Sequence, residues 1–208
     1  AGLTIIDGGG LDRVFDVPIS GNAMISDLTI QNGGNVNVAQ GGALYMSGGS
    51  AGAQVTLERV VVSNNSATSE GGGIYNDAVL TLNDVEISGN NAPLGGGLFN
   101  AQDATLNGVT ISGNTADFGA GINNSNQGVT LSLTNVTISG NTATSQGGGI
   151  FTAKSAVLTN ATVAFNTASA GGGIYVSGGQ GDAEALDKRQ PGLLVEQDGD
   201  QPGGSIVG

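Results

Sequence analysis

The chain has 208 residues, of which five are basic and seventeen acidic, so its net charge at neutral pH is -12. This charge argues against nucleic acid and anionic membrane surfaces as partners, because both carry phosphates that would repel the protein. The sequence also lacks a continuous apolar stretch long enough to span a bilayer. Histidine and cysteine are absent, which removes the commonest general base, the commonest transition-metal ligand and any disulfide. We therefore expect no metal site and no cofactor.

Three strand-like runs open the chain, at residues 3–6, 13–17 and 24–30. The segments between them are rich in glycine, asparagine and aspartate and include a proline, a composition that is typical of turns. The start of the chain is therefore predicted to be short strands joined by turns. Because no apolar leader precedes Ala1, we expect a processed product or an excised segment, and export is compatible with either.

A glycine run that ends in an aliphatic and usually an aromatic residue is the strongest signal in the sequence. It reads GGGIY at Gly71. Close copies begin at Gly41, Gly95, Gly119, Gly147 and Gly171. The starts recur at a fixed period, and the two wider gaps place short insertions, expected to be exposed turns, at residues 46–54 and 123–128. The equal spacing of the starts at Gly71, Gly95 and Gly119 is the period, and a fixed period of this length predicts a solenoid of stacked repeats.

Each repeat holds three strand-like runs. The middle run alternates apolar and polar residues, as in VTIS at residues 109–112; a weaker run precedes it, and the glycine run follows it. Three short strands within one such repeat leave no room for helices, and a parallel coil brings equivalent residues together. About seven coils spaced at about 4.8 Å would make a rod roughly 30 to 35 Å long. The predicted interior ladders include Val85, Val109 and Val136, and Ile87, Ile111 and Ile138.

A column of asparagines precedes the glycine runs by a short, nearly constant interval. Its members are Asn65, Asn90, Asn114, Asn141 and Asn166. Stacked asparagine side chains donate and accept amide hydrogen bonds along the column, and asparagine tolerates left-handed turns, so we interpret the column as structural. The alternative, a row of glycan attachment sites, fails because Asn90, Asn114, Asn141 and Asn166 lack serine or threonine two positions later.

The repeat stops near Gly179, and the composition then changes. The predicted domains are therefore a parallel β-helix over residues 1–179 and a C-terminal tail over residues 180–208. Residues 182–189 have the pattern of a short helix with Asp182 as its N-cap. The apolar residues Leu193, Leu194 and Val195 follow Pro191-Gly192 and form a strand-like run that we interpret as a connector for assembly.

The glycine runs and the ISGN copies at residues 87–90, 111–114 and 138–141 resemble the right-handed parallel β-helices of the pectin-lyase-like superfamily. Within it they are most similar to the repeats of bacterial polymorphic membrane proteins and autotransporter-like adhesins. The likeness covers residues 3 to about 179. It implies an all-β, right-handed solenoid at the surface of a bacterial-like cell or outside it, and it is specific for fold rather than for function.

The last residue of each glycine run forms a further column. It contains Tyr45, Tyr75, Phe99, Asn123, Phe151 and Tyr175. Strict alternation with the preceding Leu or Ile would point the aromatic rings outward. Such a stripe would be a protein interface, a platform for sugar rings or a surface covered by the tail, whereas a bend at this corner would leave both columns partly buried. The sequence leaves these alternatives open.

Polysaccharide lyases and hydrolases use basic residues or grouped carboxylates. The five basic residues are scattered over distant coils at Arg13, Arg59, Lys154, Lys188 and Arg189. The candidate acids Asp77, Asp84, Asp103 and Asp117 occupy different positions in the repeat. We therefore expect a protein that is not an enzyme, and a polysaccharide-degrading activity is only the third hypothesis.

The leading hypothesis is an extracellular structural or adhesive protein that associates with itself end to end into a filament. Its basis is that a β-helix has open strand edges at both ends, which invite pairing unless they are covered. The alternative is the passenger fragment of a larger surface adhesin, whose lateral face binds a glycan or another host-surface ligand.

Overall fold

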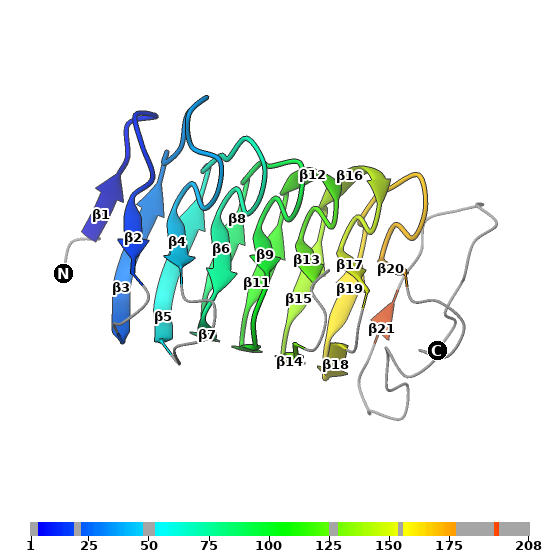
Figure 1. The fold of residues 1–208 in the computed structure, drawn as a ribbon. Coiled ribbons are helices and arrows are strands. Elements are labelled where there is room, and N and C mark those ends of the chain that lie inside the picture. The colour runs from blue at the N-terminus through cyan, green and yellow to red at the C-terminus, as the bar shows by residue number, and fades with distance from the viewer. Residues whose placement is uncertain are drawn as a thin grey trace.

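The computed structural model describes residues 4–18, 22–47, 53–124, 129–153 and 156–177, together with the backbone of residues 194–195. In these segments the chain winds into a coil of short parallel strands, and no helix is present (Figure 1). Every strand pair is parallel, and each strand pairs with its equivalents in the neighbouring coils. The predicted all-β parallel solenoid is confirmed. The predicted helix at residues 182–189 and most of the tail lie outside the described residues.

The strands form three sheets that run along the coil axis. The first sheet contains β1 (Thr4–Asp7), β3 (Ala23–Gln31), β5 (Gln54–Ser63), β7 (Val79–Asn83), β8 (Glu86–Ser88), β10 (Ala104–Asn107), β11 (Thr110–Ser112), β14 (Leu131–Thr134), β15 (Thr137–Ser139), β18 (Ala156–Thr159), β19 (Thr162–Ala164) and β21 (Leu194–Val195). The second contains β2 (Phe15–Val17), β4 (Leu44–Ser47), β6 (Ile74–Asp77), β9 (Leu98–Asn100), β13 (Ile122–Asn124), β17 (Ile150–Thr152) and β20 (Ile174–Val176). The third contains β12 (Thr115–Phe118) and β16 (Thr142–Gln146).

The core of the coil is a set of ladders in which one apolar residue per coil points inward. One ladder of the first sheet runs through Ile6, Ile30, Val62, Ile87, Ile111, Ile138 and Val163. The predicted valine and isoleucine ladders are buried in this core. Branched residues suit such positions because they pack against identical neighbours on a pleated surface.

The third sheet was not predicted. Its inward residues are alanines, such as Ala116 and Ala143, and its outward residues are exposed, so the apolar alternation is too weak to detect. The predicted insertions also need correction. Met46 is buried within β4 and Asn123 lies within β13, so neither is part of an exposed turn.

The two ends of the coil differ. At the N-terminal end, β1 and β2 pair on one side only, with β3 and β4. At the C-terminal end, β18 and β20 likewise have one partner each among the described strands, but β19 carries β21 on its outer side. The tail strand that the sequence assigns to a neighbouring copy is thus paired with its own chain in this structure.

Candidate functional site

The glycine run builds a tight corner between the third and second sheets. Gly71 has the left-handed φ of 63° that favours glycine. A side chain on Gly72 would place its Cβ 2.4 Å from the backbone oxygen of Asn91, so the backbones of successive coils approach too closely for any other residue. The corner directs the aliphatic residue that follows into the core, and the aromatic residue after it lies half-buried on the outer face of the second sheet.

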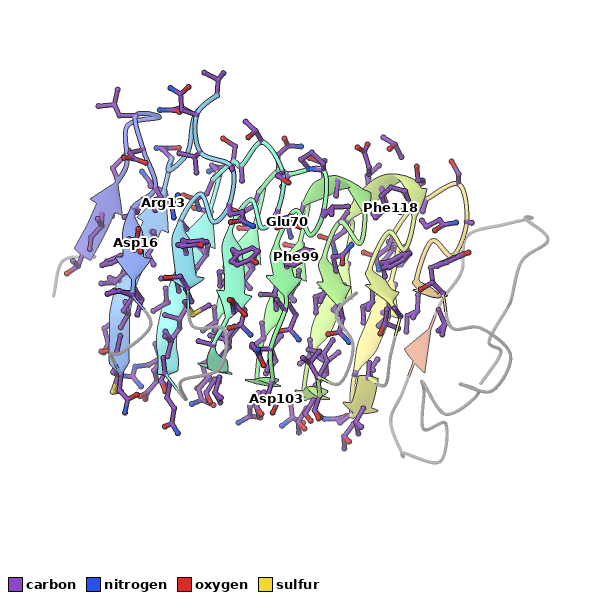
Figure 2. All side chains as sticks on the ribbon, viewed as in Figure 1. Arg13, Asp16, Glu70, Phe99, Asp103 and Phe118 are labelled. Carbon is purple, nitrogen blue, oxygen red and sulfur yellow. The ribbon has the colours of Figure 1, made fainter. Side chains whose placement is uncertain are left out.

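The aromatic residues of this column stack along the coil axis, face to face (Figure 2). The ring centroids of Tyr45 and Tyr75 lie 5.2 Å apart, and those of Tyr75 and Phe99 lie 5.4 Å apart with nearly parallel planes. Phe151 and Tyr175 stack in the same way, at 5.6 Å. Most of the rings are half-buried, and Phe99 is buried. The column is therefore neither a free outward stripe nor part of the core.

This stacking limits what the column can bind. A sugar ring packs on the face of an aromatic ring, and within each stack those faces are covered by the neighbouring rings. Along the side of the coil, mainly ring edges and the tyrosine hydroxyl ends remain for solvent. The aliphatic column is buried, as strict alternation requires, whereas most of the aromatic rings are half-buried, so the geometry differs from a bend that leaves both columns partly buried. The stacked rings offer little to a ligand that needs a flat aromatic surface.

Arg13 covers the N-terminal end of the stack. Its guanidinium carbon lies 4.4 Å from the ring centroid of Tyr45, which is a cation–π contact. Asp16 occupies the column position beside Tyr45 in the second sheet and is 3.7 Å from a guanidinium nitrogen of Arg13. The column thus changes from aromatic to ionic at the first coil.

The stack is interrupted at Asn123, and Phe118 compensates for the interruption. Phe118 contacts Phe151 edge-on, with the centroids 5.8 Å apart. The Asn123 amide nitrogen donates to the Phe118 carbonyl oxygen at 3.2 Å, while the Asn123 side-chain oxygen is buried without a partner. Sequence reasoning missed Phe118. The available signal was an aromatic residue directly before the one glycine run that lacks an aromatic end.

Three polar side chains, those of Gln40, Glu70 and Asp77, lie near Tyr75 in the N-terminal half of the stack. Gln40 donates its side-chain N–H to the Glu70 carboxylate at 2.5 Å. Burial, together with the nearby carboxylates of Glu70 and Asp77, raises the pKa of Tyr75 to about 12. A phenol with such a pKa stays protonated at neutral pH, so Tyr75 is poorly suited to accept a proton there.

The predicted asparagine column is buried and continuously hydrogen-bonded. The side-chain oxygen of Asn114 accepts from the backbone N–H of Asn90 at 2.9 Å and from its amide group at 3.0 Å. In return, the Asn114 amide donates to the Ile87 carbonyl and to the Asn141 side chain. The same pattern links Asn65 to Asn90 and continues to the end of the column. These side chains satisfy the backbone groups of the turn, as a structural ladder must.

A second buried polar column, which the sequence analysis overlooked, runs along the second sheet. The Asn76 amide donates to the Asn100 oxygen at 2.7 Å, and the Asn100 amide donates to Asn124 at 2.9 Å. The Asn124 amide then donates to the Thr152 hydroxyl. A signal was present, because each of these asparagines directly follows a member of the aromatic column and so recurs with the period of the repeat.

The candidate catalytic acids do not gather at one place. Asp77 ends β6 in the second sheet, Asp84 lies in a left-handed bend of the first sheet, and Asp117 lies on the third. Asp103 accepts the Thr130 backbone N–H, and Asp117 accepts the Thr144 hydroxyl. In the described segments no three carboxylates come together as a metal site would require. Arg59, the basic residue nearest to several of these acids in sequence, is paired with Asp27 and Glu58.

Stacked coils, buried polar ladders and glycine corners together define a parallel β-solenoid. Residues 18–187 match the family model described as the right-handed β-helix region, and the chain belongs to that family. The coil is therefore right-handed, as the sequence resemblance implied. No curated protein and no solved structure matches the chain. None of the described segments forms a helix that is long and apolar enough to cross a membrane.

Proposed function

We propose that this chain is an extracellular structural or adhesive β-helix protein that associates with itself end to end into a filament. The observation that carries the proposal is the open backbone edge at each end of the described coil. β1 and β2 face outward at one end, and β18 and β20 face outward at the other. Unpaired edges of this kind are templates for pairing with another chain.

Exposed apolar side chains near the ends support the same proposal. Ile5 and Leu11 in the first coil are 53% and 78% exposed, and Phe165 in the last coil is 68% exposed. Covering such side chains on association is favourable, because it removes apolar surface from water. A second copy in line with the first supplies both the backbone partner and the cover.

The lateral aromatic column gives less support to the alternative of a glycan-binding adhesin fragment. Most of its ring faces are already occupied by neighbouring rings and by Arg13, and the outer face of Tyr175 lies at the end of the coil rather than on its lateral surface. A polysaccharide lyase or hydrolase also has little support, because the described carboxylates are dispersed over different sheets. We therefore place self-association before ligand binding, and ligand binding before catalysis.

Electron microscopy and analytical ultracentrifugation of the purified full chain test the proposal. We expect filaments about as wide as one coil, whose length increases with protein concentration. Because each copy carries a net charge of -12, added salt should lengthen them by screening the repulsion between copies. A monomer at every concentration and ionic strength contradicts the proposal.

The alternatives have their own measurement. A glycan array with the wild-type chain and with Tyr75→Ala and Tyr175→Ala detects lateral sugar binding, which these substitutions would weaken in a monomer. Incubation with polygalacturonate and alginate, with and without Ca²⁺, detects chain cleavage. Binding or cleavage without filaments would favour these functions over self-association.

A further inference from the structure

The first and last coils of the molecule fit each other in register on the first sheet. Strand pairing carries the position of Ile6 through every coil to Val163 in β19. A β1 strand from a second copy, added to the last coil in the same register, would therefore set its Ile6 beside Val163. That place is occupied by the chain's own β21, where Val195 pairs with Val163.

The second sheet gives the same fit. Its pairing carries Phe15 through the coils to Ile174, and Val17 to Val176. In a second copy placed in register, the inward apolar residues of β2 would therefore pack against the inward apolar residues of β20 in the first copy. On the outer side, Asp16 of the second copy would lie beside Tyr175.

The turn that follows β19 also leaves room for the first coil of a second copy. Phe165 follows β19 with a φ of 56°, which is a strained conformation for a residue with a large side chain, and its ring is largely exposed. In the three preceding coils a glycine holds this turn position: Gly89, Gly113 and Gly140. The equivalent residue after β1 is Gly8, which has no side chain to collide with the Phe165 ring.

We infer that copies join with their coils in continuous register, so that β1 of one copy replaces β21 of the next and Arg13 lies between Tyr45 of its own chain and Tyr175 of the neighbour. One face of the Arg13 guanidinium already covers Tyr45. The other face is directed to the side on which the neighbour's last coil arrives. Arg13 thus joins the aromatic column of one copy to that of the next. This inference rests on the proposed end-to-end association.

In this arrangement β21 acts as a removable cap. It competes with β1 of a second copy for the outer edge of β19, so it slows association. A connector strand, as expected from the sequence, would have the opposite effect. The two roles of β21 therefore predict opposite changes in the association rate when β21 is weakened, and this sign tests the inference separately from the proposed function.

Engineered cysteines test the register, because the natural chain has none. We would mix Asp16→Cys with Tyr175→Cys under mild oxidation and measure the cross-linked dimer. Neighbouring residues on adjacent parallel strands are about 4.8 Å apart, which lies within the Cα separation of a disulfide. The control mixes Met24→Cys with Tyr175→Cys, because Met24 is 65% exposed but lies on the first sheet, one coil away from the joint. We expect cross-linking of the first mixture only.

Two further full-length variants test the contacts at the joint by sedimentation and light scattering. Arg13→Met removes the cation and keeps a similar stem, and it should lower the association constant about threefold to tenfold. Arg59→Met changes the net charge equally but lies away from both ends, and it should leave the constant within about twofold of wild type, once the small general effect of net charge is allowed for. Leu194→Pro weakens β21 by removing a backbone donor and should raise the association rate.

The outcomes separate the inference from the proposed function. Filaments in which both cysteine mixtures cross-link equally, or in which Arg13→Met behaves as Arg59→Met does, overturn the joint but leave self-association standing. Slower association of Leu194→Pro overturns the cap and restores the connector. Absence of any association by the wild-type chain overturns the proposed function, and the joint with it.

Discussion

The two ladders on either side of the glycine corner are built on the same period but follow different rules. The column from Asn65 to Asn166 is buried and unbroken. The column from Tyr45 to Tyr175 is mostly half-buried and is interrupted at Asn123. Both place one residue on each coil, so their geometry does not explain why only one of them tolerates a change of residue type.

The difference lies in what each ladder must satisfy. The asparagines pair backbone donors and acceptors that have no access to water, and a buried polar group without a partner is costly. The aromatic residues gain dispersion and stacking, which a neighbouring side chain can supply from another direction. Phe118 does so where Asn123 leaves the stack. Directional hydrogen bonding therefore fixes residue identity, whereas packing fixes only occupied volume.

Breaking the asparagine ladder should have the largest effect. Asn114→Ala removes four side-chain hydrogen bonds. The buried backbone N–H of Asn90 then loses its acceptor, and the Ile87 carbonyl and the Asn141 side-chain oxygen each lose one donor, although the Asn141 oxygen keeps the backbone N–H of residue 114. We expect the free energy of unfolding to fall by about 4 kcal/mol or more. Chemical denaturation followed by circular dichroism measures it. Asn91→Ala is the matched control, because this neighbour is exposed and bonds the Thr115 hydroxyl at the surface. Equal losses for the two variants would refute the argument.

Breaking the aromatic ladder should cost less. Phe99→Ala removes a buried ring from the end of a three-ring stack, with an expected loss of about 3 kcal/mol. A double-mutant cycle with Tyr75→Ala isolates the stacking itself, for which we expect a coupling of about 1 kcal/mol. The cycle of Phe99→Ala with Tyr175→Ala is the control. Those rings are not in contact, so their effects should add, and a coupling of similar size there would point to a global effect instead.

The parts that were predictable from sequence are those with strong local demands. The glycine runs predict the coil because only glycine fits the close approach of the backbones at Gly72. The asparagine column could also be recognised from the sequence, because no other side chain makes the same set of hydrogen bonds to the turn. The third sheet escaped prediction because alanines such as Ala116 give almost no apolar signal. The burial of the aromatic rings was undecidable, because alternation gives their direction, outward from the core, but not how far stacked neighbours cover them.

Asparagine occurs in both ladders, because Asn123 occupies one position of the aromatic column. Asn123 is as buried as Asn114, but it makes one hydrogen bond, and its oxygen has no partner among the described residues. We therefore expect Asn123→Ala to change the free energy of unfolding by no more than about 1 kcal/mol, because the lost bond is offset by removal of the unpaired oxygen. The same denaturation experiment decides it. A loss as large as that of Asn114→Ala would mean that burial, rather than pairing, sets the cost.

The smallest effect concerns the half-buried character of the stack and is visible only at high pH. Burial, followed by the charges of Glu70 and Asp77, raises the pKa of Tyr75 from 10.0 to about 12. A phenol whose pKa is higher in the folded state favours folding below pH 10, and that contribution is lost as the pH rises from about 10 towards 12. The absorbance of tyrosinate during an alkaline titration, taken as the difference between wild type and Tyr75→Phe, isolates this group from the other two tyrosines. We expect its midpoint near 12 and a flatter loss of stability above pH 10 in Tyr75→Phe. A midpoint near 10 would mean that the ring is fully solvated, and that the aromatic column is an open surface after all.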